Sequence, residues 1–367
     1  KKKRINSIIN RGLEFSKKEL QNVSRILEDV KQNGDEALIK YTNRFDSSAV
    51  KIDSLVVSTA EFEKAESLVD KTFIDSLDIA ISRIENFHKR QLENSWIDTN
   101  RRGIVLGRIV NPVEKAGIYV PGGKGGITPL VSSVLMGVIP AKIAGVKTIL
   151  IVTPPTKQGF VNPYLLVAAK KVGVDAVFKI GSAWAIGALT YGTKTVPKVD
   201  VIAGPGNLYV TLAKKSVSGI VGIDMIAGPS ELLIIADKFA NYEFVAADLL
   251  SQAEHDPQAS SILITDSKKI AEEVDKSLAK QLEKLSRKEI AKSSIESFGA
   301  IIMVKDVDIA IALSNLIAPE HLELLIKEPF EQIGKIKNAG AVFMGQYSPE
   351  PVGDYIAGPN HVLPTAG

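Results

Sequence analysis

The chain has 367 residues, of which 45% are hydrophobic and 24% are charged, and this balance excludes bulk disorder. Its formal net charge of +3 is too small to indicate a nucleic-acid partner, and no apolar run is long enough to predict a membrane-spanning helix. Cysteine is absent, which excludes disulfides, thiolate metal sites and cysteine nucleophiles and fits a cytoplasmic location. The length predicts about two or three domains.

The first hundred residues are predicted to be helical. Two Ser-x-x-Glu motifs, at residues 16–19 and 58–61, have the capping-box spacing that begins a helix. Apolar residues recur at helical spacing between residues 72 and 94, and His88 falls on the same face. A histidine in that position is more typical of packing than of ligand binding.

From residue 103 onward, short apolar segments alternate with helical patterns. Apolar strands that alternate with helices predict parallel sheets covered on both faces, so the fold class is α/β with a helical N-terminal segment. Glycine and proline concentrate at the strand ends, and ligands of such sheets bind beyond the carboxyl ends of the strands. The predicted strands are residues 104–106, 117–120, 148–152, 176–180, 199–203, 232–236, 261–265, 300–304 and 341–344.

Gln252 and His255 stand three residues apart at the end of a predicted helix, so both side chains can project from one face. An amide oxygen and an imidazole, joined by a carboxylate from elsewhere, suit Zn²⁺ or a similar divalent metal. A histidine that merely interacts with the helix dipole is the alternative, and the spacing alone favours it.

Two further clusters pair a carboxylate with an imidazole. Glu320 and His321 follow Pro319, which can start a helix, and together they can supply two bases or a base and its orienting partner. An exposed first turn without function is the alternative. Asp354 and His361 lie in a segment too rich in glycine to pack as core. Because three such clusters occur in a chain with four histidines, we predict a polar site.

A phosphate-binding turn is indicated by the sequence GPGN at residues 204–207, which follows an apolar strand and precedes a helical pattern. The segment lacks the third glycine of the dinucleotide-binding fingerprint, and no acidic residue stands at the expected distance. The classical fingerprint is therefore not present.

Residues 111–364 resemble the histidinol dehydrogenase family. The resemblance rests on six motifs in the same order, namely GIYVPGG (117–123), GPGN (204–207), AGPSE (227–231), LSQAEH (250–255), APEHLE (318–323) and GPNHVLP (358–364). It implies zinc-dependent oxidation of L-histidinol to L-histidine through L-histidinal, with two hydride transfers to NAD⁺, as the last step of histidine biosynthesis. It also implies a homodimer that binds neither nucleic acid nor membranes.

The resemblance implies roles for individual residues of the reaction site. Gln252, His255 and Asp354 are expected to bind zinc, and Glu320 and His321 are expected to act as the catalytic bases. The residues expected to contact the substrate are Ser230, Gln252, His255, His321 and Asp354.

The NAD contacts implied by the resemblance are Tyr119, Trp184 and Asn207. The family usually has glutamine at the position of Trp184. A tryptophan ring cannot accept a hydrogen bond from the cofactor, although it can stack on it.

The resemblance also implies two Rossmann-like domains, one inserted in the other. We expect a helical segment over residues 1–19, a discontinuous α/β domain with the metal and catalytic residues over 20–118 and 232–367, and an inserted NAD-binding domain over 119–231. The family continues into a C-terminal segment that gives a glutamate to the substrate and a histidine to zinc across the dimer. The sequence stops at Gly367, so we expect it to hold zinc weakly.

The absence of cysteine constrains the second oxidation. Without a thiol to hold the aldehyde, that step requires an aldehyde hydrate formed by activated water, and Glu320 and His321 can share the two bases that this needs. Two other functions stay open at this point. A metal-dependent hydrolase would turn over without NAD⁺, and a binding protein would take up histidinol without forming NADH.

Overall fold

The computed structural model describes residues 15–123 and 129–365, which form two compact units. One unit consists of Phe15–Met225 with Tyr355–Val362, and we call it the first unit. The second unit contains Ile226–Asp354 and the described residues from Leu363 onward. Within these ranges, no helix combines the length and apolarity that a membrane span requires.

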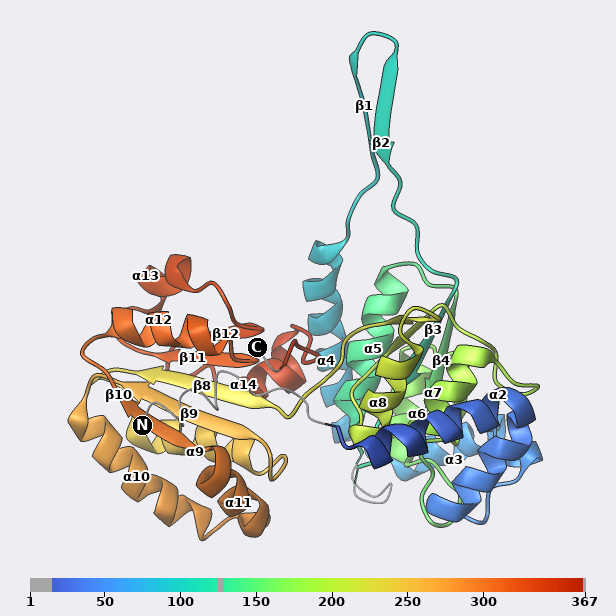
Figure 1. The fold of residues 1–367 in the computed structure, drawn as a ribbon, viewed down its shortest axis with the longest axis horizontal. Helices are drawn as coiled ribbons and strands as arrows, with labels where there is room; N and C mark the ends of the chain where they lie inside the picture. The colour runs from blue at the N-terminus through green and yellow to red at the C-terminus, as the bar shows by residue number, and fades with distance from the viewer. Residues whose placement is uncertain (1–14, 124–128, 366–367) are drawn as a thin grey trace. The chain divides into compact units, whose positions relative to one another are not determined.

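The first unit is built on a parallel sheet with helices on both faces (Figure 1). The strand order is β5 (Ala176–Phe178), β4 (Thr148–Val152), β3 (Lys115–Tyr119), β6 (Val201–Ala203) and β7 (Gly222–Ile223). One face packs against α2 (Lys17–Phe45), α7 (Ser182–Tyr191) and α8 (Leu208–Val217). The other face packs against α3 (Thr59–Leu68), α4 (Lys71–His88), α5 (Val131–Ile143) and α6 (Pro163–Lys171).

Local sequence explains these elements. Both predicted capping boxes are confirmed, since Ser16 and Ser58 cap α2 and α3 and their side chains accept from the N–H groups of Glu19 and Glu61. Strand β4 is apolar from Ile149 to Val152 because alternate residues enter different cores. His88 is buried at the end of α4, where its Nδ1 lies 2.6 Å from the Oε1 of Gln91, so it packs as expected.

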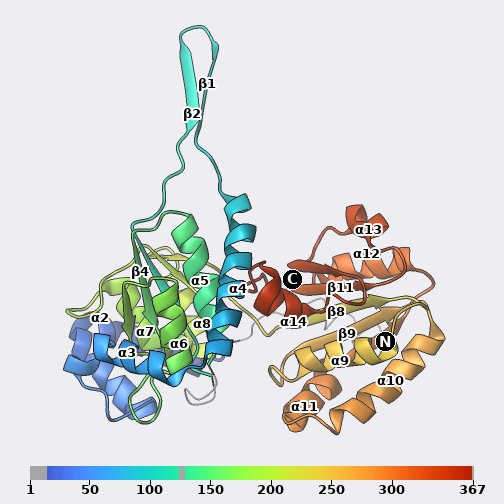
Figure 2. The same cartoon turned by 180° about the vertical axis from the view of Figure 1, so that it is seen from behind.

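A separate antiparallel ribbon of two strands also belongs to the first unit. It consists of β1 (Trp96–Arg101) and β2 (Ile104–Arg108). Both views show the ribbon standing clear of the parallel sheet (Figures 1 and 2). The strand predicted at residues 104–106 therefore exists but is not part of an α/β layer.

The second unit repeats the architecture of the first. Its parallel strands run in the order β10 (Ala300–Met303), β9 (Ser260–Thr265), β8 (Glu231–Ala236), β11 (His321–Leu325) and β12 (Ala341–Met344). Helices α9 (Tyr242–Ala253) and α10 (Lys268–Leu282) cover one face, joined by α11 (Lys288–Phe298), and α12 (Val307–Ile317) covers the other. The short helical elements are η1 (Ile52–Ser54), η2 (Lys89–Gln91), α13 (Pro329–Gln332), η4 (Ile333–Lys335), α14 (Glu350–Val352) and the π-helical turn η5 (Gly353–Ala357).

The predicted α/β class with parallel sheets is confirmed, but the units divide the chain differently from the expected domains. Residues 20–118, expected to fold with residues 232–367, belong to the same unit as residues 119–225. The physical reason is that β3 pairs with both β4 and β6, so a boundary at residue 118 would cut a central strand. Of the expected segment 1–19, residues 1–14 lie outside the described residues, and α2 runs on from Lys17 to Phe45.

Candidate active site and nucleotide pocket

Glu320 and His321 stand at the amino end of the second unit's sheet. The prediction that Pro319 starts a helix here is wrong. Helix α12 ends at Ile317, Ala318 takes a left-handed conformation (φ 52°), and His321 then opens strand β11. The sequence analysis expected ligands to bind beyond the carboxyl ends of the strands, but this pair lies at the amino end of β11. Glu231 opens the neighbouring parallel strand β8, and all three residues are buried.

The backbone of Glu231 fixes both side chains. Its N–H donates to Oε2 of Glu320 over 3.1 Å, and its carbonyl oxygen lies 3.1 Å from Nδ1 of His321. Because a carbonyl oxygen can only accept, Nδ1 carries a proton, and in the neutral imidazole the lone pair is then on Nε2. Ser230 precedes Glu231 directly, and its side chain lies near enough to Glu320 to lower the pKa of that carboxyl, which opposes the effect of burial.

Further carboxyl groups surround the imidazole of His321. Oδ1 of Asp354 lies 3.8 Å from Nε2, and Oε2 of Glu320 lies 3.8 Å from Nδ1. His321, Glu350 and Asp354 each present one ligand-type atom within 4.8 Å of the others. Imidazole nitrogen and carboxylate oxygens are ligands that a divalent metal accepts.

Burial shifts the protonation of these acids. It raises the pKa of Glu320 to about 8, with Glu231 and Asp354 adding repulsion while the backbone N–H of Glu231 opposes the shift. Burial likewise raises the pKa of Glu350 to about 9 and that of Asp354 to about 6. A cation at this site would relieve the repulsion that the ionised groups exert on one another.

A second pair of acids lies deeper in the same unit. Glu323 follows His321 by two residues on β11 and accepts the backbone N–H of Glu350 over 2.8 Å. The side chain of Asp248, on α9, lies beside Glu323, and burial raises the pKa of both groups. The sequence analysis missed Glu231, Glu323, Glu350 and Asp248. A carboxylate inside the apolar strand HLELL is the one local signal that could have identified a member of this group.

Gln252 and His255 do not share a helical face. Helix α9 ends at Ala253, so Gln252 is buried in its last turn whereas His255 follows the helix and is exposed. Neither amide atom of Gln252 has a hydrogen-bond partner among the residues the structure describes. The cluster of ligand atoms around Asp354 contains His321 and Glu350 but not His255.

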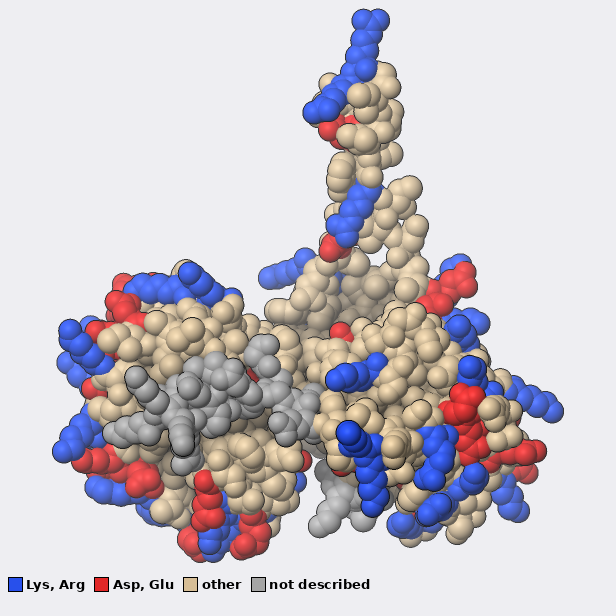
Figure 3. All heavy atoms as spheres, in the orientation of Figure 1, with Lys and Arg blue, Asp and Glu red and all other residues tan. Residues whose placement is uncertain are grey.

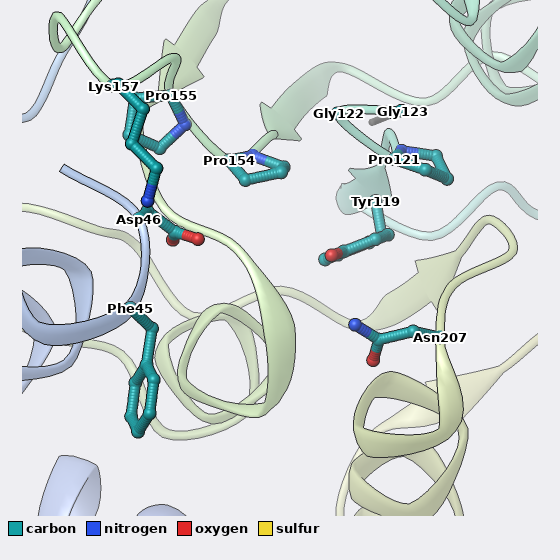
Figure 4. A pocket seen from close by; sticks show the side chains of 10 residues that line it. All are labelled: Phe45, Asp46, Tyr119, Pro121, Gly122, Gly123, Pro154, Pro155, Lys157 and Asn207. Carbon is teal, nitrogen blue, oxygen red and sulfur yellow. The ribbon is translucent and has the colours of Figure 1, made fainter. Parts of the chain in front are cut away.

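A cavity of about 280 Å³ opens in the first unit beyond the carboxyl ends of β3 and β4 (Figure 4). Strand β3 is also where the strand order reverses, since the chain goes from it first to β4 and later to β6. Such switch points hold the ligands of open α/β sheets. The cavity is lined by Phe45, Asp46, Tyr119, Pro121, Gly122, Gly123, Pro154, Pro155, Lys157 and Asn207.

Two of the predicted NAD contacts, Tyr119 and Asn207, line this cavity. The hydroxyl of Tyr119 accepts the N–H of Ser182, the first residue of α7, over 3.0 Å. The amide oxygen of Asn207 caps α8, and its amide nitrogen points into the cavity (Figure 4). Gly204 has a φ of +114°, and a Cβ there would lie 2.1 Å from the carbonyl oxygen of Tyr119, so the GPGN turn requires glycine at this point.

Trp184, the third predicted NAD contact, is buried in the core behind the cavity and does not line it. Its ring stacks on Phe45 at 5.8 Å and on Tyr41 at 5.9 Å, and its Nε1–H donates to the hydroxyl of Thr42. Since Phe45 lines the cavity, Trp184 supports a wall of it.

Asp46 and Lys157 are charged residues of the cavity that the sequence analysis missed. Burial raises the pKa of Asp46 to about 6, and the nearby Lys157 opposes this shift. Oδ2 of Asp46 is buried without a hydrogen-bond partner among the described residues. Asp46 follows α2 directly. The sequence around it does not predict that it lines a cavity, because the other walls of the cavity come from distant segments.

Two parallel-sheet units, one with a cavity at its switch point and the other with a buried acid–imidazole cluster, define an α/β enzyme. The family model described as histidinol dehydrogenase matches residues 10–367. The chain belongs to the histidinol dehydrogenase family and is therefore an oxidoreductase.

Individual relatives agree with this assignment. The chain is 53% identical to a histidinol dehydrogenase of Desulfotalea psychrophila over 345 residues, which are 94% of the chain and 80% of the relative. It is 51% identical to that of Clostridium acetobutylicum over 348 residues, covering 95% and 80%. The crystal structure of histidinol dehydrogenase from Elizabethkingia anophelis superposes with a TM-score of 0.94 at 42% identity, over 100% of this chain and 83% of that one.

Proposed function

We propose that the protein oxidises L-histidinol to L-histidine through L-histidinal, transferring two hydrides to NAD⁺, as the last step of histidine biosynthesis. The observation that supports this most is the pair Glu320 and His321, which the backbone of one residue, Glu231, holds side by side in a buried acidic site. We further infer a cytoplasmic enzyme. The homodimer that the resemblance implies is part of this proposal.

The donor set around Asp354 fits zinc. The family motifs assign Gln252, His255 and Asp354 as ligands. The amide of Gln252 is buried and has no hydrogen-bond partner among the described residues, so its oxygen is available to coordinate a metal ion. Glu350 is a further carboxylate donor within reach of Asp354, whereas Nε2 of His321, which lies in the same cluster, is left to act as a base. Bound Zn²⁺ would anchor the imidazole and amine of the substrate and orient the reacting carbon.

His321 is proposed as the base for the alcohol proton. In the neutral imidazole the lone pair is on Nε2, because Nδ1–H donates to the carbonyl of Glu231. When the substrate's O–H proton moves to Nε2, the carbon can release a hydride to NAD⁺ and become the aldehyde. Asp354, 3.8 Å from Nε2, stabilises the imidazolium that results.

Glu320 is proposed as the base for the water that adds to histidinal. As water adds to the aldehyde carbon, one of its protons moves to Glu320 and the aldehyde oxygen becomes an alkoxide. This hydrate anion then releases the second hydride to NAD⁺ and becomes the carboxylic acid. The raised pKa of Glu320, about 8, suits a group that takes and returns a proton near neutral pH. Because the chain has no cysteine, no thiol can hold the aldehyde.

The cavity of the first unit is proposed to take part of NAD⁺. Tyr119 and Asn207 are the motif residues that line it. The carboxylate of Asp46 can accept hydroxyl groups, as an acidic residue does for the ribose in other nucleotide-binding folds. A negative charge on Asp46 would also repel the ribose phosphate of NADP⁺, which favours NAD⁺ as the cofactor.

An assay of NADH formation with histidinol, NAD⁺ and zinc tests the proposal. We expect NADH to appear only when both substrates are present, and a chelator to abolish it. A metal-dependent hydrolase would turn over its substrate without NAD⁺, and a binding protein would bind histidinol without forming NADH. Either result would refute the proposed reaction.

A further inference from the structure

The first unit contains a buried ion pair that the proposed reaction does not use. Lysine and arginine side chains stand out over the surface that Figure 3 shows, whereas the side chain of Lys214 on α8 is 3% exposed. Its ammonium group pairs with the carboxylate of Asp224, which follows β7 directly and is 17% exposed. Burying two charges costs free energy that their attraction only partly returns, and well-packed apolar side chains often stabilise a fold as much. Stability alone therefore does not explain this pair.

The ion pair holds both backbone polar groups of Gly204. The N–H of Gly204 donates to Oδ2 of Asp224 over 2.8 Å, and its carbonyl oxygen accepts from Nζ of Lys214 over 3.0 Å. Gly204 comes directly after β6 and has a φ of +114°, a backbone conformation that residues with a side chain rarely adopt. Hydrogen bonds to charged groups are stronger than those between neutral groups, so the pair keeps the residue in this conformation.

The carboxylate of Asp224 is itself fixed by the backbone around it. Its Oδ1 accepts the N–H of Met225 over 2.7 Å, and the N–H of Asp224 donates to the carbonyl oxygen of Ile202 on β6 over 3.2 Å. The ion pair therefore joins α8 to the carboxyl ends of β6 and β7, which are neighbouring parallel strands.

Gly204 begins the GPGN turn, and this turn leads to Asn207. The amide oxygen of Asn207 accepts the N–H groups of Tyr209 and Val210, which directs its amide nitrogen into the cavity (Figure 4). Lys214 lies about two turns further along α8, so its contact with Gly204 ties the helix back to the start of the turn. Removing this contact frees the helix and its cap to shift relative to β6.

We propose that Lys214 and Asp224 are positioning residues for the nucleotide, and that they hold the GPGN turn in the shape that NAD⁺ binds. The inference rests on the proposed binding of NAD⁺ in the cavity of the first unit. Neither residue lines the cavity, so the pair acts through the turn and through Asn207, which does line it. The backbone of Gly204 also packs against the carbonyl group of Tyr119, since a Cβ there would lie 2.1 Å from that oxygen. A displaced turn would therefore disturb both motif residues of the cavity.

A second buried ion pair in the same unit supplies a matched control. Nζ of Lys179, which follows β5, lies 2.6 Å from Oε1 of Glu61 on α3, and the two side chains are 4% and 21% exposed. Neither residue lines the cavity. Replacing either lysine by methionine removes the same charge from a similar environment, but only Lys214→Met loosens the GPGN turn.

Calorimetric titration of NAD⁺ into the full chain tests the proposal. Lys214→Met should raise the Kd for NAD⁺ about tenfold, and Lys179→Met should leave it unchanged although both variants lose stability. In turnover, the KM for NAD⁺ should rise with Lys214→Met, while kcat at saturating NAD⁺ and the KM for histidinol stay the same. Equal Kd values for the two variants would overturn the proposal. A wild-type protein that binds no NAD⁺ would refute the proposed function and this inference with it.

A double-mutant cycle supplies the second measurement, with circular dichroism to show that each variant is folded. Asp224→Asn leaves Lys214 without its counter-charge, so this change alone should also raise the Kd about tenfold, and it tests the same effect if Lys214→Met does not fold. Because the two residues act as one unit, the protein that carries both changes should have about the same Kd as either variant. A rise of about a hundredfold, the product of two independent effects, would show that the residues act separately and would refute the role of the pair.

Discussion

Replacing Glu320 by glutamine should separate the two oxidations while preserving the fold. Burial raises the pKa of this carboxyl from 4.5 to about 8, so ionising it in place costs roughly 5 kcal/mol more than in water. A neutral amide avoids that cost and keeps an oxygen that accepts the N–H of Glu231. We therefore expect the free energy of unfolding at pH 7 to stay the same or to rise.

The catalytic effect of Glu320→Gln should be large and confined to one half-reaction. Loss of a positioned base costs about 10²–10⁴-fold in rate, and we expect this loss when histidinal and NAD⁺ are supplied. The rate with histidinol, measured as the first NADH formed in a single turnover, should fall much less. His321→Ala should show the opposite pattern. Equal, small losses in both half-reactions for Glu320→Gln would refute the division of roles.

Three further changes have expected outcomes. Asp46→Asn should raise the Kd for NAD⁺ about tenfold and reduce the preference for NAD⁺ over NADP⁺, both measured by calorimetric titration. An unchanged ratio of the two Kd values would contradict the role of the carboxylate. Lys214→Met should lower the free energy of unfolding by about 1–3 kcal/mol in urea, because the buried Lys214 pairs with Asp224 and donates to the carbonyl oxygen of Gly204; an unchanged or higher free energy of unfolding would argue against this. Without metal, the folded state holds extra protons on Glu320 and Glu350, so the free energy of unfolding should fall as pH rises from about 4.5 to about 9, and an increase would contradict the shifts.

The fold class could be predicted because its signals are local. Strand β4 is apolar at four consecutive positions, 149–152, which indicates burial on both faces, and the GPGN turn at residues 204–207 marks the end of β6. The serine and glutamate that begin α2 and α3 satisfy backbone groups within one turn. Such features depend only on neighbouring residues, so the chain reveals them without its tertiary structure.

The chemistry of the second unit depends on distant contacts, and much of it could not be predicted. Glu320 and Glu231 are 89 residues apart, and they meet because β8 and β11 are parallel neighbours. Pro319 is compatible with the start of a helix, but Ala318 turns the chain into a strand instead. Glu350 enters the site from a short helix whose sequence carries no ligand pattern.

The cavity of the first unit combines both situations. Tyr119 and Asn207 lie in motifs, so the sequence could single them out, whereas Asp46 enters from the end of α2 without a sequence signal. The position of Trp184 in the sequence did not show that its side chain lies behind the cavity and does not line it. Its side chain fills the core and stacks on Phe45, so its effect on a ligand would pass through that ring.

The stoichiometry of the complete reaction tests the central claim most directly. Purified protein with zinc, a limiting amount of histidinol and excess NAD⁺ should form two molecules of NADH for each histidinol consumed, with histidine as the product by chromatography. One NADH per histidinol with accumulated histidinal, or consumption of histidinol without NADH, would contradict the proposal that this site carries out both oxidations.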